Sequence, residues 1–225
     1  SEYRADGILS EAMLNFLAQL GWNDGTEQDI FTKEELIEKF SLERVQKSGA
    51  RFDEQRLLWL NGQWIRRISL DDLFNRVKDF WGESARNANE EYKKEVLGLV
   101  FDRLKTLKDL PLASDYFFAE QNPDLEMVSK NKQLKKLEKS QLLDLLGKSI
   151  DKFEKVEDWN DDELQESLNQ LLEETGQKPG ILFQIIRISL TWAPFSPALN
   201  QTLRVIGKNE SIKRLKNSFQ EIEKM

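Results

Sequence analysis

The sequence predicts an all-α fold, and three observations support this prediction. Apolar residues recur at three- and four-residue spacing along most of the 225 residues, which is the spacing of residues on one face of a helix. Residues that commonly cap helices (Ser, Thr, Asp and Asn) stand before several of these apolar runs. No stretch alternates apolar and polar residues for long enough to propose a β-strand.

The first hundred residues contain a series of expected helices. Apolar residues from Ile8 to Leu20 share one side of a helix that Ser10 can cap at its start. Thr32, with Glu35 three residues later, is a capping-box signal for a second helix that ends near Phe40. Further helices are expected at Asp53–Arg66, Leu70–Phe80 and Asn89–Arg103.

The rest of the chain is also predicted to be helical, with clear interruptions. Leu134 and Leu137 lie in a Lys-rich stretch, which therefore predicts an exposed helix at Lys130–Lys139. Lys178, Pro179 and Gly180 predict a turn, and Pro194 and Pro197 break the chain later. Between and after these breaks, we expect helices at Glu163–Glu174, Ile181–Thr191 and Glu210–Glu223.

The composition excludes several classes of chemistry. The chain has no His and no Cys, which rules out Ser-His-Asp triads, Cys nucleophiles, disulfides and ordinary zinc sites. It carries 33 Lys and Arg against 40 Asp and Glu, a net charge of −7. This balance is unusual for a nucleic-acid binder, but the local field of one face decides which ions it attracts. No apolar run approaches the ~20 residues that a membrane-spanning helix needs.

Four segments near the start of the chain contain distinctive sequence motifs. They are Tyr3–Trp22, Gln28–Ile37, Arg44–Asp53 and Leu57–Ile65. In this order they resemble bacterial-type glutamyl-tRNA synthetase, a class I aminoacyl-tRNA synthetase family. A weaker resemblance continues to the closing segment, through Phe183–Thr191, Ser196–Leu199 and Ile206–Lys208. The resemblance therefore covers essentially the whole chain.

The resemblance implies a tRNA-binding region rather than a catalytic one. The family's His-Ile-Gly-His motif and its Lys-Met-Ser-Lys-Ser-like loop are both absent, so we expect the chain to begin beyond the catalytic half and to be inactive alone. A composition shift at Trp81–Ser84 predicts a domain boundary. By resemblance, residues 1–82 are a helical stem-contact domain. Residues 83–133 and 134–225 are then the two subdomains of a helical-bundle anticodon-binding domain.

Cations in the first part are candidates for contact with the tRNA stem. Backbone phosphates of the stem can be bound by Lys47, Arg51 and Arg66, and by Arg67, which follows Arg66 in the sequence. The alternative is that each is an ordinary solvated charge. Lys47 and Arg51 lie within a block that matches the family, which favours the RNA role for these two.

The resemblance places the anticodon-reading residues at five positions. They are Arg103, Arg187, Ser196, Pro197 and Leu199. Arg103 matches the position at which discriminating members of the family separate glutamate from glutamine anticodons. Arg187 stands in an apolar helix and needs a partner there, which can be either a carboxylate or a flipped-out base. At Ala198 the sequence departs from the glycine that is usual in the family.

The aromatic residues divide into two groups. Trp192 and Phe195 can either stack on bases or pack in the core. Trp22, Trp59 and Trp64, and the run Tyr116-Phe117-Phe118, are predicted to be packing residues.

The resulting functional prediction is the tRNA-binding C-terminal half of a glutamate–tRNA ligase. Its expected partners are tRNA(Glu) and its own N-terminal catalytic domain; ATP and Mg²⁺ belong to the parent enzyme, and no cofactor is expected in this chain. We expect a cytoplasmic monomer that does not contact membranes. One alternative is a helical protein-interaction scaffold without RNA binding. A free-standing enzyme is disfavoured because there is no His and no glycine-rich phosphate loop.

Overall fold

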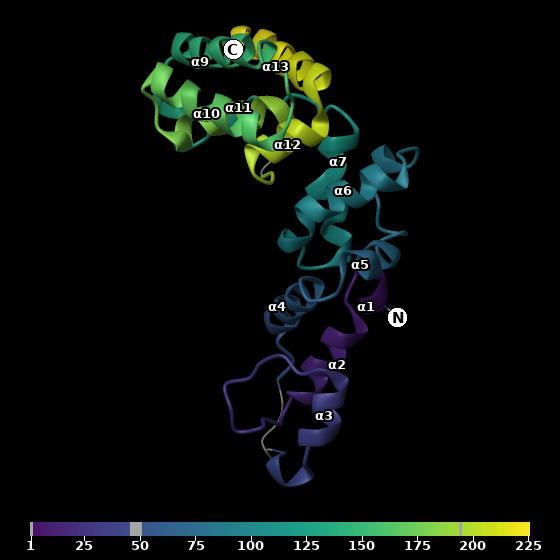
Figure 1. The fold of residues 1–225 in the computed structure, drawn as a ribbon. Coiled ribbons are helices and arrows are strands. Elements are labelled where there is room, and N and C mark those ends of the chain that lie inside the picture. Colours follow the sequence, from purple (N-terminus) through teal and green to yellow (C-terminus); the bar gives the residue numbers. More distant parts are fainter. Residues whose placement is uncertain (1, 46–50, 194) are drawn as a thin grey trace. The chain divides into compact units, whose positions relative to one another are not determined.

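A computed structural model describes residues 2–45, 51–193 and 195–225, and these residues are helical with connecting loops (Figure 1). The described part contains no strand; Trp22 and Val45 form one isolated antiparallel bridge. The all-α prediction is therefore confirmed. The chain divides into two compact units, residues 1–113 and 114–225. This division does not test the three predicted functional regions 1–82, 83–133 and 134–225, which stay predictions.

The first unit consists of short helices joined by tight turns. In chain order they are α1 (Glu2–Ala5), α2 (Ser10–Ala18), α3 (Lys33–Lys39), the 3-10 turn η1 (Leu42–Arg44), α4 (Glu54–Ile65), α5 (Leu70–Arg76), η2 (Glu83–Ala85), α6 (Glu90–Val100), η3 (Phe101–Arg103) and η4 (Leu107–Asp109). Helix α7 (Leu110–Phe118) carries the chain from the first unit into the second.

Side-chain caps explain where several of these helices begin. The hydroxyl of Thr32 accepts the N–H of Glu35, whose carboxylate accepts the N–H of Thr32, so the predicted capping box is present. The side chain of Asp53 caps α4 in the same way, and that of Asn89 caps α6. The predicted Ser10 cap is wrong, because Ser10 is already the first residue of α2.

Leu9 takes the capping position of α2, and a buried amide explains why. The N–H of Leu9 donates to Oδ1 of Asn61 at 2.8 Å. The Asn61 amide nitrogen also donates to the carbonyl oxygens of Gly7, at 3.1 Å, and Lys105, at 2.7 Å. Asn61 is fully buried, and it satisfies buried backbone groups from two distant segments, as such groups require. This one side chain joins α4 to both segments.

Two predicted helices in the first unit are too long. The helix expected at Leu70–Phe80 ends at Arg76, and the one expected at Asn89–Arg103 ends at Val100. In the second case the chain tightens into η3, a common way for a helix to end.

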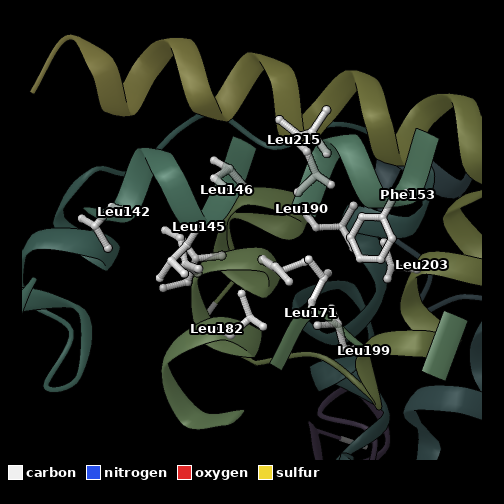
Figure 2. Packing of buried hydrophobic residues seen from close by; sticks show 14 of the residues in the cluster. Leu142, Leu145, Leu146, Phe153, Leu171, Leu182, Leu190, Leu199, Leu203 and Leu215 are labelled. Carbon is white, nitrogen blue, oxygen red and sulfur yellow. The ribbon is translucent and has the colours of Figure 1, made fainter. Parts of the chain in front are cut away.

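The second unit is a bundle around one core. Its elements are α8 (Glu126–Ser129), η5 (Leu134–Lys136), α9 (Lys139–Glu154), α10 (Asp161–Thr175), α11 (Pro179–Thr191), α12 (Leu199–Ile206) and α13 (Lys208–Glu223). Figure 2 shows leucines from α9 to α13 filling the space between these helices, with Phe153 towards one end of the cluster. Helix α10 ends at Gly176 in the left-handed conformation, as expected for a C-terminal glycine.

The exposed helix predicted at Lys130–Lys139 is wrong. Only η5 forms within this stretch, and α9 begins at Lys139. Oδ1 of Asn131 accepts the N–H groups of Gln133 and Leu134, which turns the chain before a helix can form. Leu134 is fully buried in the core instead of lying along an exposed helix.

Two further differences and one agreement concern the second unit. Pro179 and Gly180 form the first turn of α11 instead of a free turn, because proline is well suited to the first helical position. Helices α9 and α12 have no counterpart among the predicted helices. Tyr116 and Phe117 are buried, as predicted.

Candidate nucleic-acid interface

A group of cations lies where α4 ends, in the first unit. Arg66 caps the C-terminus of α4, and its Nη1 donates to the backbone oxygen of Asp102 at 3.0 Å. Arg103 follows directly in η3, with Nε 3.9 Å from the carboxylate of Asp102. Arg66, Arg103 and the nearby Lys105 are all exposed. Arg66 and Arg103, predicted to contact different parts of the tRNA, are therefore neighbours in the structure.

The positive charge of this group is available to a ligand. Arg66 uses one of its five donors on a neutral carbonyl, which leaves its charge in place. The Arg103–Asp102 pair is long and its two side chains are 42% and 60% exposed, so it contributes little binding energy of its own. A phosphate or base edge can compete for either guanidinium.

The other two predicted stem-contact residues precede α4. Arg51 is exposed and lines a groove of about 480 Å³ together with Asp29, Asp53 and Arg56. Arg56 is held by Asp29 at 2.5 Å. Lys47 lies outside the described residues.

In the second unit, the structure brings Arg187 and Ser196 together. Nε of Arg187, on α11, donates to the hydroxyl of Ser196 at 2.9 Å, and that hydroxyl donates to the carbonyl of Pro197 at 3.2 Å. Arg187 is half-buried on an apolar helix, and the turn that follows this helix supplies a polar partner for it. The Ser196 hydroxyl fixes the direction of the guanidinium.

The remaining predicted anticodon residues shape the turn between α11 and α12. Ser196 and Leu199 are each 4% exposed, and Leu199 belongs to the core of the second unit. Pro197 is buried as well, whereas Ala198 is exposed. At this turn the surface is therefore formed by Ala198 and by the half-buried Arg187 rather than by Leu199.

Trp192 has an unusual backbone at the start of the same turn. It caps α11 with φ 42° and ψ 41°, the left-handed conformation that bulky residues rarely adopt. Among the described residues it is the only one besides glycine with positive φ. Its side chain is 7% exposed. Packing is therefore the role of Trp192 in this structure, and Phe195 is the half-buried aromatic of the turn.

Sequence reasoning missed one surface aromatic. Trp22 and Trp64 are buried as predicted, but Trp59 is 40% exposed, so its assignment as a packing residue is wrong. The guanidinium carbon of Arg56 lies 4.6 Å from the centre of a Trp59 ring. The helical spacing of Trp59 from Leu57, Leu60 and Trp64, all on the buried side, could have revealed this.

The described residues contain neither a metal-binding cluster nor a membrane-spanning helix. No group of three or more His, Cys, Asp or Glu side chains there could hold a metal ion. Within the same residues, none of the helices combines the length and the apolar character needed to cross a bilayer.

Comparisons with known proteins point to one family of RNA-binding domains. Residues 72–219 match the family model for the anticodon binding domain, and residues 1–59 match that for the catalytic domain of class I tRNA synthetases (E and Q). Arg103, Arg187 and the Ser196–Leu199 turn lie within the first match, and Arg51 lies within the second.

Individual relatives agree with these matches. The chain is 32% identical to glutamate–tRNA ligase from Clostridium acetobutylicum over 97% of this chain and 44% of the relative. It is 34% identical to that of Thermus thermophilus, over 96% of this chain and 45% of the relative. A crystal structure of glutamate tRNA ligase from Elizabethkingia meningosepticum, in complex with its amino acid, superposes with TM-score 0.82 and 25% identity, covering 98% of this chain and 43% of that one.

The chain thus spans less than half the length of these relatives. Because the anticodon-binding match covers well over half of its 225 residues, the chain belongs to the anticodon binding domain family.

Proposed function

We propose that this chain is the tRNA-binding region of a glutamate–tRNA ligase, which holds tRNA(Glu) and reads its anticodon. The match of residues 72–219 to the anticodon binding domain carries the proposal, and the likeness to glutamate–tRNA ligases over nearly the whole chain supports the amino acid specificity. Glutamylation itself uses ATP and Mg²⁺ in a catalytic domain of the same enzyme, acting as a monomer in the cytoplasm.

Each predicted contact has a physical basis in this proposal. Arg103 offers an exposed planar fork of donors that can pair with the edge of the third anticodon base. Arg187, oriented by Ser196, offers a second fork beside the Pro197 turn. Arg51 and Arg66 bind phosphates along the stem, as does Lys47. Contacts with the matching anticodon stabilise the bound tRNA in the geometry that glutamylation in the catalytic domain requires.

The contact that is proposed to discriminate between tRNAs can be tested by charging assays. In a full-length enzyme that contains this chain, Arg103→Gln should narrow the ratio of kcat/KM for tRNA(Glu) over tRNA(Gln) by roughly ten- to hundredfold, since a base-edge contact contributes about 1–3 kcal/mol. Arg86→Gln is the matched control, because Arg86 is also exposed and forms an ion pair with its near neighbour Glu83. An unchanged ratio in Arg103→Gln would show that Arg103 does not read the anticodon.

Arg187 needs a second readout, because it is half-buried. Arg187→Ala should weaken tRNA(Glu) binding while the melting temperature stays within a few degrees of wild type. A large drop in melting temperature with unchanged affinity of the folded protein would make Arg187 structural. Absence of salt-sensitive tRNA binding by the wild-type chain would remove the whole proposal.

A further inference from the structure

Helix α4 carries a strip of polar and aromatic side chains along the side that faces away from its packed residues. Arg56, Trp59 and Gln63 follow one another at spacings of three and four residues, so they line up along one face of α4. Arg67, two residues beyond the end of α4, extends this strip because it lines the same groove as Trp59 and Gln63. The opposite face buries Leu57, Leu60, Asn61, Trp64 and Ile65. Trp59 is 40% exposed although the core accepts two other tryptophans of this unit.

A groove runs beside this strip. It has a volume of about 490 Å³, and its lining includes Trp59, Gln63 and Arg67 from the strip, with Asp29 and Glu35 opposite. That volume lies in the range of small-molecule sites.

Both carboxylates of the groove are already engaged within the protein. Asp29 pairs with Arg56 at 2.5 Å. Glu35 accepts the N–H of Thr32 at 2.7 Å and an amide hydrogen of Gln28 at 3.1 Å. These bonds lower the pKa of Glu35, the one from the Thr32 backbone most of all, so this carboxylate stays ionised and occupied at neutral pH.

The groups at the other end of the strip are unengaged. In the described part of the chain, the guanidinium of Arg67 and the amide of Gln63 have no hydrogen-bond or ion-pair partner. Arg67 follows Arg66 in the sequence, and the guanidinium of Arg66 donates to the neutral backbone carbonyl of Asp102. Arg56, anchored by Asp29, lies over the indole of Trp59 and holds it in place. The strip therefore presents a fixed aromatic surface with free cationic and amide donors beside it.

We infer that Trp59, Gln63 and Arg67 form a second RNA contact, in which Trp59 stacks on an unpaired nucleotide of the tRNA and Arg67 binds its phosphate. This rests on the proposed function. It adds Trp59 and Gln63 to the residues assigned to the anticodon and stem, and it gives Arg67, a predicted phosphate contact beside Arg66, a specific nucleotide. Gln63 lies between the two and can pair with the ribose 2′-hydroxyl or a base edge. We favour RNA over a protein partner because the cation beside the indole, Arg67, has no carboxylate partner in the described part of the chain, and a stacking aromatic next to a cation suits a base and its phosphate.

The test measures tRNA(Glu) affinity of the whole chain across a range of salt concentrations. Trp59→Ala should weaken binding roughly tenfold with an unchanged salt slope, because stacking releases no counterions. Trp59→Phe should retain most of the affinity. Arg67→Ala should weaken binding and reduce the slope of log K against log salt by about one. Ile37→Ala, which removes a 73% exposed apolar side chain from α3 in the same unit, is the matched control and should bind as wild type.

Each other outcome identifies which proposal fails. If wild type binds tRNA and both Trp59→Ala and Arg67→Ala bind it as tightly as wild type, the inference is overturned and the proposed function stands. If Ile37→Ala weakens binding as much as Trp59→Ala, the effect is general to this unit and the inference is also overturned. If wild type binds no tRNA, the proposed function itself fails. Melting temperatures of all variants check that each is folded.

Discussion

At the scale of single residues, Gly7 occupies a position with no room for a side chain. Its φ of 78° is left-handed, and a Cβ there would lie 2.5 Å from the backbone nitrogen of Leu107. Its carbonyl accepts the N–H of Leu107 at 3.1 Å and an amide hydrogen of Asn61. The backbone itself, not a movable side chain, occupies the space that any substituent would need.

We therefore predict that Gly7→Ala lowers the free energy of unfolding by about 3 kcal/mol, the sum of left-handed strain and overpacking. Gly25 is the matched control in the same unit, with φ 80° and nothing within 4 Å of the position of a Cβ. Gly25→Ala should lose only the strain, about 1 kcal/mol. Urea denaturation gives both values, and equal losses would show that the approach of Leu107 has no energetic weight.

Residue roles were predictable from the sequence only where the requirement was local. The apolar neighbours of Arg187 showed that this side chain needs a polar partner, but only the fold identifies Ser196 as one. Asn61 gave no signal, because the groups it bonds are 44 to 54 residues away in the sequence. Trp59 was misassigned because its large apolar side chain suggested packing, whereas its position on the face of α4 away from the core determines its exposure.

At the scale of elements, an ion pair joins α2 to α5 and makes their contact dependent on pH. Nη2 of Arg76 lies 2.8 Å from Glu11 and 2.7 Å from Asp72. The hydrogen bond from Arg76 lowers the pKa of Glu11 below its ordinary range, and the bonds to Glu11 and Asp72 raise the pKa of Arg76. A carboxyl whose pKa is lowered by folding stabilises the fold above its unfolded pKa and loses that stabilisation as the pH falls through the folded value.

Glu11→Gln should therefore be less stable than wild type at pH 7, by about 1 kcal/mol at most for a partly exposed pair. The difference should shrink below about pH 4.3, where the wild-type carboxyl begins to protonate. Thermal melts between about pH 3 and about pH 7, a range that spans the ordinary pKa of carboxyl groups, measure the stability difference between wild type and Glu11→Gln. Glu83→Gln, which removes an exposed partner of Arg86, should show no such trend; a constant difference for Glu11→Gln would contradict this account.

Helix boundaries were predictable where a side-chain cap fixes them. Thr32, Asp53 and Asn89 each accept a backbone N–H at the expected start. The prediction failed at Lys130–Lys139, where lysine and leucine favour a helix but Asn131 and the burial of Leu134 impose a turn. It also missed α12, because the prolines before it suggested a loop. At Lys130–Lys139 the hydrogen bonds of Asn131 outweighed the helix preference of the sequence, and at α12 the packing of Leu199 and Leu203 in the core favours a helix despite the prolines before it.

At the scale of the whole molecule, the family was predictable from the order of motif blocks, whereas the division of the chain was not. The matched family explains why the four opening blocks occur together, since residues 1–59 and 72–219 match successive domains of tRNA synthetases. Along the chain, the boundary between the compact units falls between Ala113 and Ser114, inside helix α7. A continuous helix has no change of composition to mark such a division, so only the packing of side chains could show it.

This division predicts how the chain unfolds. Leu146 is fully buried in the core of the second unit, and Leu60 is fully buried in the first. Each Leu→Ala substitution should lower the free energy of unfolding by about 3 kcal/mol, through lost burial and the cavity it leaves.

Because each unit has its own buried core, Leu146→Ala should lower amide protection in residues 114–225 and leave the protection of residues 1–113 nearly unchanged. Leu60→Ala should do the reverse. Native-state hydrogen exchange resolved by peptide measures both regions in one sample. Equal loss of protection in both regions after either substitution would mean that α7 couples the two cores into one cooperative unit.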